Sequence, residues 1–245
     1  MKAILSTEKI SKKFDGIYAV KDFSVELFPG QITGVIGPNG SGKTTFINLI
    51  TGRYFADGGT IVLPSGHRTH HLKTHRAAPN GITRTFQSVH LFYQMSVLDN
   101  LYNVVTPRNP LLALFSRRRK KDHHRVAEVL KELGLWEKRK DLVQNLSYGQ
   151  RKLLEIGRTL MVDAQVYCFD EPYAGLFPAM IERVKEIFRR LKAEGKCILW
   201  VEHNINLIKE LSDRVLFMDQ GELLADGKAK DVFNLPQVLE AYLGH

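Results

Sequence analysis

The sequence predicts an α/β fold, and three consecutive features near its start support this prediction. An apolar run at 32–36 is long enough for one buried strand. A glycine-rich loop follows at 37–45. Apolar residues then recur at the spacing of one helical face, at Phe46, Ile47, Leu49 and Ile50. A strand, a glycine loop and a helix in this order are the context of a phosphate-binding loop.

The loop has the pattern G-x-x-x-x-G-K-[ST]. Its residues are Gly37, Pro38, Asn39, Gly40, Ser41, Gly42, Lys43, Thr44 and Thr45. The glycines allow backbone N–H groups to surround phosphates, and the helix N-terminus adds a positive dipole. We expect Lys43 to reach the β- and γ-phosphates of a nucleotide and the Thr44 hydroxyl to bind Mg²⁺. A glycine-rich turn that carries Lys-Thr by coincidence is disfavoured, because both flanks of the loop fit.

Polar side chains at the ends of three other strand-like runs suit chemistry at these phosphates. Asp170 would supply the carboxylate that holds Mg²⁺, and Glu171 would orient and polarise the attacking water. His203 is expected to contact the γ-phosphate, although an isolated histidine here is more often structural. The amide of Gln87 can reach both Mg²⁺ and water. Asp-Glu-Pro also occurs as a helix cap or a surface turn, an alternative that the preceding apolar run disfavours.

The two ends of the chain predict strands, and the middle predicts helices. Strands are expected at 3–10, 20–28, 60–63, 82–87, 166–169, 197–201, 214–218 and 222–225. Val126, Val129, Leu130 and Leu133 keep helical spacing, and Gly134 is placed to stop that helix. We therefore expect one domain, 1–245, with a core at 1–88 and 162–245 and an inserted helical subdomain at about 89–161.

Composition limits the class of protein. The chain is 44% hydrophobic and 25% charged, with a formal net charge of +9. No apolar run approaches the roughly 20 residues of a membrane helix. We expect a cytosolic protein whose membrane role comes through a partner, and reduced, buried thiols at Cys168 and Cys197. The positive charge indicates anionic partners. A nucleotide is the expected one, and charge alone does not choose between nucleic acid and lipid headgroups as others.

Two polar segments each allow two interpretations. Four histidines between 64 and 79 could bind a metal ion or belong to a solvated connection; they are His67, His70, His71 and His75. No cysteine or close carboxylate cluster completes a ligand set there, which favours the connection. The apolar stretch 110–115 and the basic run from Arg117 to Lys121 could contact a membrane surface or an acidic partner, or form a solvated loop.

In order and spacing, these motifs resemble those of the ATP-binding cassette ATPases over essentially all 245 residues. By that resemblance, 37–45 is the Walker A loop, 166–170 is Walker B, and Glu171 is the catalytic glutamate. Gln87 resembles the Q-loop glutamine, His203 the switch histidine, and 146–150 the signature motif. Phe14 lies where an aromatic ring usually stacks on adenine.

The resemblance implies a P-loop NTPase with the ABC ATPase fold: a RecA-like core, an antiparallel β region and an inserted helical subdomain. It implies ATP and Mg²⁺ as ligands and a second cassette as partner, in a homodimer or a heterodimer. In that dimer Ser147, Gly149 and Gln150 would contact the γ-phosphate held by Lys43 of the other chain. It also implies membrane permease subunits, an external solute-binding protein, and a location on the inner face of the cell membrane.

Finer features are similar to the ATPase subunits of branched-chain amino acid importers. They are Arg84 to Gln87, Met95 to Leu101, Tyr148, and Ala174 to Leu176. Lipopolysaccharide and lipid exporters share several of these features, so an export motor is the alternative. A soluble cassette ATPase acting on nucleic acid or ribosomes is less favoured, since neither a second cassette nor a long coiled coil is present, and no nucleic acid partner is expected. Phe177 departs from the family, which usually has Asp or Asn there.

Overall fold

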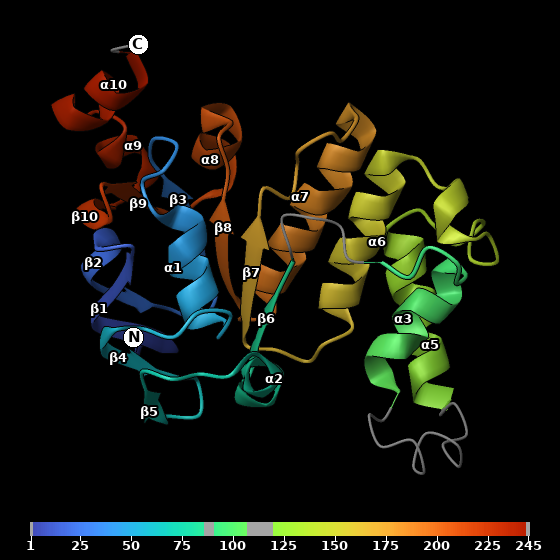
Figure 1. Ribbon diagram of the computed structural model, residues 1–245. Coiled ribbons are helices and arrows are strands. Elements are labelled where there is room, and N and C mark those ends of the chain that lie inside the picture. The colour runs from blue at the N-terminus through green and yellow to red at the C-terminus, as the bar shows by residue number, and fades with distance from the viewer. Residues whose placement is uncertain (1, 86–90, 107–119, 244–245) are drawn as a thin grey trace. The chain divides into compact units, whose positions relative to one another are not determined.

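The computed structural model describes residues 2–85, 91–106 and 120–243 (Figure 1). The chain forms two compact units. Unit 1 comprises 1–84, 164–171 and 188–245, and unit 2 comprises 85–163 and 172–187. The subdomain boundaries expected from the sequence stay a prediction.

The strands belong to unit 1. Its elements are β1 (Leu5–Phe14), β2 (Ile17–Leu27), β3 (Ile32–Ile36), α1 (Lys43–Ile50), β4 (Gly58–Val62), β5 (Arg68–Thr69), α2 (Thr74–Ala77), the 3-10 helix η1 (Ala78–Asn80), β6 (Ile82–Arg84), β7 (Val166–Asp170), β8 (Cys197–Val201), α8 (Ile205–Leu211), β9 (Arg214–Asp219), β10 (Glu222–Gly227), α9 (Ala229–Val232) and α10 (Pro236–Leu243). The helices of unit 2 are α3 (Val97–Val105), α5 (Lys120–Glu132), the 3-10 helix η2 (Val143–Asn145) and α6 (Tyr148–Leu160). Helix α7 (Pro178–Ala193) begins in unit 2 and ends in unit 1.

A mixed sheet with the strand order β10-β9-β3-β8-β7-β6 forms the centre of unit 1. Its pairs are parallel except for β10 with β9. Every residue of β3, β7 and β8 is buried, as expected for strands covered on both faces. Because parallel strands end at the same edge of a sheet, the loops after β3, β7 and β8 emerge together.

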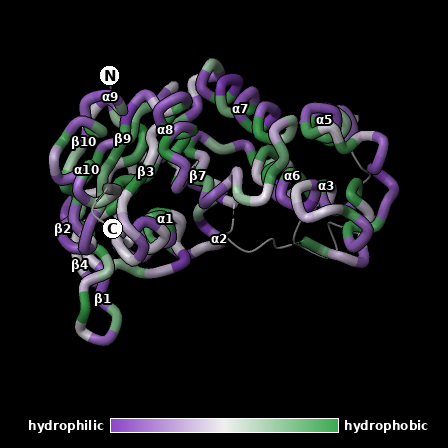
Figure 2. Tube along the Cα trace, turned by 90° about the horizontal axis from the view of Figure 1, so that it is seen from above, coloured by the Kyte–Doolittle hydropathy of each residue, from purple (hydrophilic) through white to green (hydrophobic). Residues whose placement is uncertain are grey.

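The second sheet of unit 1 is antiparallel, in the order β2-β1-β4-β5. Strand β2 contributes Phe23 to a core that it shares with α1, where the rings of Phe23 and Phe46 lie 4.5 Å apart. Figure 2 colours much of α1 and the neighbouring strand segments as hydrophobic. This core therefore holds the helix that follows the glycine loop.

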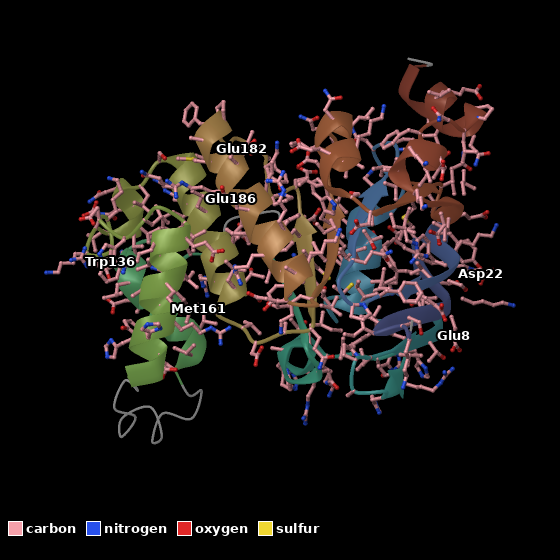
Figure 3. All side chains as sticks on the ribbon, turned by 180° about the vertical axis from the view of Figure 1, so that it is seen from behind. Glu8, Asp22, Trp136, Met161, Glu182 and Glu186 are labelled. Atoms are coloured by element: carbon pink, nitrogen blue, oxygen red, sulfur yellow. The ribbon has the colours of Figure 1, made fainter. Side chains whose placement is uncertain are left out.

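Unit 2 packs its helices around buried aliphatic side chains. These include Leu101, Val126, Leu130, Leu133, Leu153 and Ile156. A Cβ atom at Gly157 of α6 would lie 2.5 Å from the Leu133 side chain, so glycine permits this close packing. Gly134 has a φ of +67° after α5, which confirms it as the helix stop. On α7, Glu182 and Glu186 are exposed and lie one turn apart (Figure 3).

The predicted α/β class is confirmed, and so are strands at most of the expected places. Strand 197–201 has the predicted bounds, whereas the first strand runs to Phe14 and not to residue 10. The pairing of β1 with β2 shifts register three times between Thr7 and Lys13, so the apolar alternation in the sequence does not mark where the strand ends. The stretch 110–115 and residues 117–119 of the basic run lie outside the described residues.

Phe46→Ala tests the importance of the core under α1. Phe46 is fully buried, so the truncation should lower the free energy of unfolding by about 3–5 kcal/mol, measured by chemical denaturation. Phe55→Ala is the matched control, because Phe55 is 46% exposed and should cost less than about 1 kcal/mol. Equal losses for the two variants would contradict this description of the core.

Candidate functional site

The glycine loop after β3 leaves no room for a side chain at two of its positions. A Cβ atom at Gly37 would lie 1.9 Å from the Met218 carbonyl oxygen, and one at Gly42 would lie 2.0 Å from that of Ala19. Both glycines have positive φ values, +148° and +102°. At Gly40, by contrast, a Cβ atom would meet nothing within 4 Å. The loop is thus pressed against the protein at its two ends and open at its middle.

Lys43 is held inside this loop at the first residue of α1. Its ammonium group donates to the carbonyl oxygens of Gly37 at 2.9 Å and Pro38 at 2.7 Å, and to the Ser41 hydroxyl at 3.3 Å. Burial lowers the pKa of Lys43, and the nearby carboxylates of Glu171 and Asp170 oppose that shift. The Lys43 ammonium, next to the backbone of the glycine loop, suits the negative charge of a phosphate chain.

Asp170 ends β7 as a fully buried carboxylate. Arg84, at the end of the neighbouring β6, places Nη2 3.6 Å from Oδ2 of Asp170. The same guanidinium donates to the side-chain oxygens of Asn48 and Thr51, at the C-terminal end of α1. Arg84 therefore joins the acidic strand end to the helix of the glycine loop.

Glu171 and His203 form a direct hydrogen bond. His203 Nε2 lies 3.0 Å from Oε1 of Glu171. The Glu171 backbone is in the left-handed region, with φ of +49°, and its N–H donates to the Val201 carbonyl oxygen at 3.0 Å. A non-glycine residue held in this region is strained and is common at functional sites. The Glu171 side chain meets His203 in the loop after β8.

Helix α6 of unit 2 begins with the other predicted site residues. Ser147 is the N-cap, and it forms a capping box with Gln150: Gln150 N–H donates to Ser147 Oγ at 3.3 Å, and Ser147 N–H donates to Gln150 Oε1 at 3.0 Å. This confirms the predicted cap. A Cβ atom at Gly149 would lie 2.8 Å from the Met180 sulfur, so a larger residue here would require the Met180 side chain to shift.

A family model described as "ABC transporter" matches residues 20–174, which include the glycine loop, Asp170 and Glu171. The chain belongs to the ABC transporter family. It is a cassette ATPase of the kind that couples ATP hydrolysis to transport. Its ATP-binding cassette fold, predicted from the motifs, is confirmed by this match and by solved structures.

The cassette is similar to curated proteins over nearly its whole length. It is 39% identical to a probable branched-chain amino acid transport ATP-binding protein, LivG, of Archaeoglobus fulgidus, over 98% of this chain and 95% of the relative. It is 36% identical to the high-affinity LivG of Escherichia coli K12, over 98% of each chain. A crystal structure of a nucleotide-free cassette from an ABC transporter superposes with a TM-score of 0.86 at 32% identity, covering 100% of both chains.

The donor groups of the cassette fit Mg²⁺ and a phosphate chain. At Gly37 and Gly42 a Cβ atom would collide with neighbouring backbone, so the loop can close around phosphates only with glycine at these positions. Lys43 supplies the positive charge inside the loop. The hydroxyl of Thr44 and the carboxylate of Asp170 are oxygen ligands of the hard type that Mg²⁺ prefers. Among the described residues, no group of three His, Cys, Asp or Glu side chains could hold a metal ion by itself. The four histidines between 67 and 75 are therefore not part of any such group in the described ranges.

Phe14, Gln87 and the two cysteines are the remaining residues singled out from the sequence. Phe14 ends β1, is exposed, and contacts Tyr54 edge to face at 5.2 Å between ring centres. Gln87 lies outside the described residues. Cys168 and Cys197 are free and buried as predicted, and burial raises the pKa of Cys168 to about 12.

Sequence reasoning gave no role to three residues that shape the site. Arg84, Asn48 and Glu202 are buried or nearly buried polar side chains next to the predicted positions. The available signal was a charged residue at the end of a short apolar strand, as at Arg84 and Glu202. Arg84 has its partners, Asn48 and Asp170, in distant parts of the chain, so the pattern alone could not identify them. The partners of Glu202 are the N–H groups of the next two residues, and they depend on the turn that the backbone makes there.

Arg84→Met tests the ion pair with Asp170. Removing the guanidinium deprives a buried carboxylate of its cation, and the free energy of unfolding should fall by about 3–5 kcal/mol. Arg189→Met is the control, because its pair with Glu210 is exposed and should be worth less than about 1 kcal/mol. Urea titration of both variants measures the difference. A loss at Arg84 no larger than that at Arg189 would mean that the pair contributes little.

Proposed function

We propose that this cassette is the motor subunit of a branched-chain amino acid importer and that Lys43, Asp170, Glu171 and His203 form its hydrolytic site. The observation that carries the site is the cluster at one edge of the parallel sheet, where Glu171 bonds to His203 and its carboxylate lies near Lys43. The solute class rests on the relatives at 36–39% identity, whose names favour import over lipid export.

The residues divide the work by chemistry. The loop amides and Lys43 bind the β- and γ-phosphates of ATP. Mg²⁺, held by Thr44, Asp170 and Gln87, would neutralise charge on the phosphates. Glu171 orients the attacking water and accepts its proton, and His203 fixes the Glu171 carboxylate through their 3.0 Å bond. Phe14 offers an exposed ring for the adenine base.

The proposed active form pairs two cassettes, identical or different. In it, Ser147, Gly149 and Gln150 contact the γ-phosphate bound to the partner. The capping box leaves a helix N-terminus with a serine hydroxyl at its tip, a group suited to an anion. Phe177 is 68% exposed and offers no hydrogen bond, so the contact at that position would be apolar.

A surface on unit 2 suits a membrane permease subunit. Phe92, Tyr93, Met95 and Leu142 are all exposed. Arginine side chains lie over two of these rings, with Arg158 at 5.3 Å from Phe92 and Arg151 at 5.4 Å from Tyr93. Neighbouring Leu91 is buried, whereas the side chains of these four residues are exposed. We call these four residues the docking patch.

The backbone under the docking patch is fixed by hydrogen bonds. Asn100, which is buried, accepts from the Phe92 N–H at 2.9 Å and donates to the Phe92 carbonyl oxygen at 3.0 Å. The N–H groups of Val143 and Gln144 donate to the carbonyl oxygens of Met95 and Tyr93. Exposed apolar side chains on a fixed backbone are typical of interaction sites. No helix among the described residues is long and apolar enough to cross a membrane. The proposed location of the cassette is the inner face of the cell membrane, where the docking patch would bind a permease subunit.

Phe92→Asp tests the docking patch. We expect the isolated protein to stay folded, with ATP turnover within about threefold of wild type, because Phe92 is 46% exposed. Co-purification of permease subunits from gently solubilised native membranes should be lost, and uptake of radiolabelled leucine into proteoliposomes of the purified complex should fall at least tenfold.

Phe55→Asp is the matched control, since Phe55 is also 46% exposed but lies in unit 1. It should leave co-purification and uptake unchanged. A melted Phe92→Asp protein would place the residue in the core, and unchanged uptake would exclude docking through this patch. Wild-type complex that hydrolyses ATP without accumulating any branched-chain amino acid would refute the proposed solute class.

A further inference from the structure

The His203 side chain is not held by packing. It is 46% exposed, and its Nε2 atom lies 3.0 Å from Oε1 of Glu171. A half-exposed imidazole can adopt several rotamers unless its backbone directs it. The direction of the His203 side chain therefore depends on the turn that joins β8 to α8, which consists of Glu202, His203 and Asn204.

Glu202 holds this turn from inside the protein. Its side chain is 8% exposed, and Oε1 accepts two backbone hydrogen bonds, from His203 N–H at 2.8 Å and from Asn204 N–H at 3.2 Å. Hydrogen bonds to an ionised carboxylate are stronger than those between neutral groups. Both bonds constrain the peptide planes on either side of the His203 Cα atom.

Asn204 fixes the other end of the turn. Its Oδ1 accepts from the N–H groups of Asn206 at 3.0 Å and Leu207 at 3.3 Å, which caps α8. On the opposite side, the Val201 carbonyl oxygen accepts the Glu171 N–H at 3.0 Å. The strand end, the Glu171 backbone and the His203 turn are thus linked by hydrogen bonds.

Placing a carboxylate at this position is costly. Oε2 of Glu202 is buried and has no hydrogen-bond partner among the described residues. Burial raises the pKa of Glu202, and the nearby Glu171 carboxylate adds to the shift, while the two backbone N–H groups oppose it. A buried oxygen without a partner destabilises the fold. The two hydrogen bonds that Glu202 accepts, in turn, orient the backbone of the neighbouring His203.

We propose that Glu202 is a positioning residue for His203, which acts by holding both flanking N–H groups so that the imidazole meets Glu171. This inference rests on the proposed function, in which His203 and Glu171 act in ATP hydrolysis. Glu202 itself touches neither nucleotide nor water in this role.

Three variants separate orientation from simple stability. Glu202→Ala removes the acceptor, and kcat should fall at least tenfold with the ATP KM changed less than threefold. Glu202→Gln keeps an oxygen acceptor at the same reach and should retain kcat within about threefold of wild type. Glu210→Ala is the control, because it removes an exposed carboxylate from the adjacent α8 and should change neither parameter.

A spectroscopic measurement gives a second readout that turnover does not affect. In protein labelled with ¹⁵N-histidine, the His203 imidazole signal, assigned by its loss in His203→Gln, should shift in Glu202→Ala and stay in place in Glu202→Gln. If Glu202→Ala does not fold, Glu202→Leu takes its place, since it removes the acceptor while an aliphatic side chain of similar size fills the buried space.

The outcomes are distinct. An unshifted imidazole signal in Glu202→Ala, or equal loss of kcat in the Gln and Ala variants, would overturn the positioning role. Normal turnover in His203→Gln would instead refute the proposed part of His203 in hydrolysis, and the imidazole signal would still report whether Glu202 orients the ring.

Discussion

The parallel pairing of β3, β8 and β7 is the constraint on which the rest of the structure depends. It brings three loops to one sheet edge: the glycine loop with Lys43, the turn with His203, and the strand end with Asp170 and Glu171. Residues more than 100 positions apart in the sequence meet there because the carboxyl ends of parallel strands lie at the same edge of a sheet.

Charge buried at this edge needs specific partners. Asp170 is paired with Arg84, Glu202 accepts two backbone N–H groups, and Lys43 donates to the carbonyls of its own loop. Unpaired, each of these groups would cost several kcal/mol to bury. The site therefore consists of polar groups whose partners in this structure hold them ready for an anionic ligand and a metal ion.

The sequence was sufficient for the elements whose signals are local. The glycine loop, the apolar strands β7 and β8, and the Ser147 cap each depend on neighbouring residues, and all three were predicted. The register shifts of β1 and the Arg84–Asp170 pair depend on residues distant in the chain. No periodicity reports such contacts. The left-handed backbone of Glu171 is a further example, because glutamate gives no local signal for it.

The central claim is that Glu171 is the base of an ATPase whose phosphate chain Lys43 binds. The most direct measurement compares ATP affinity and steady-state turnover in Glu171→Gln, with Lys43→Ala as the control. The account predicts that Glu171→Gln binds ATP within a few-fold of wild type while turnover falls by roughly 100-fold or more, and that Lys43→Ala loses ATP binding itself. Turnover by Glu171→Gln within a few-fold of wild type would contradict the claim.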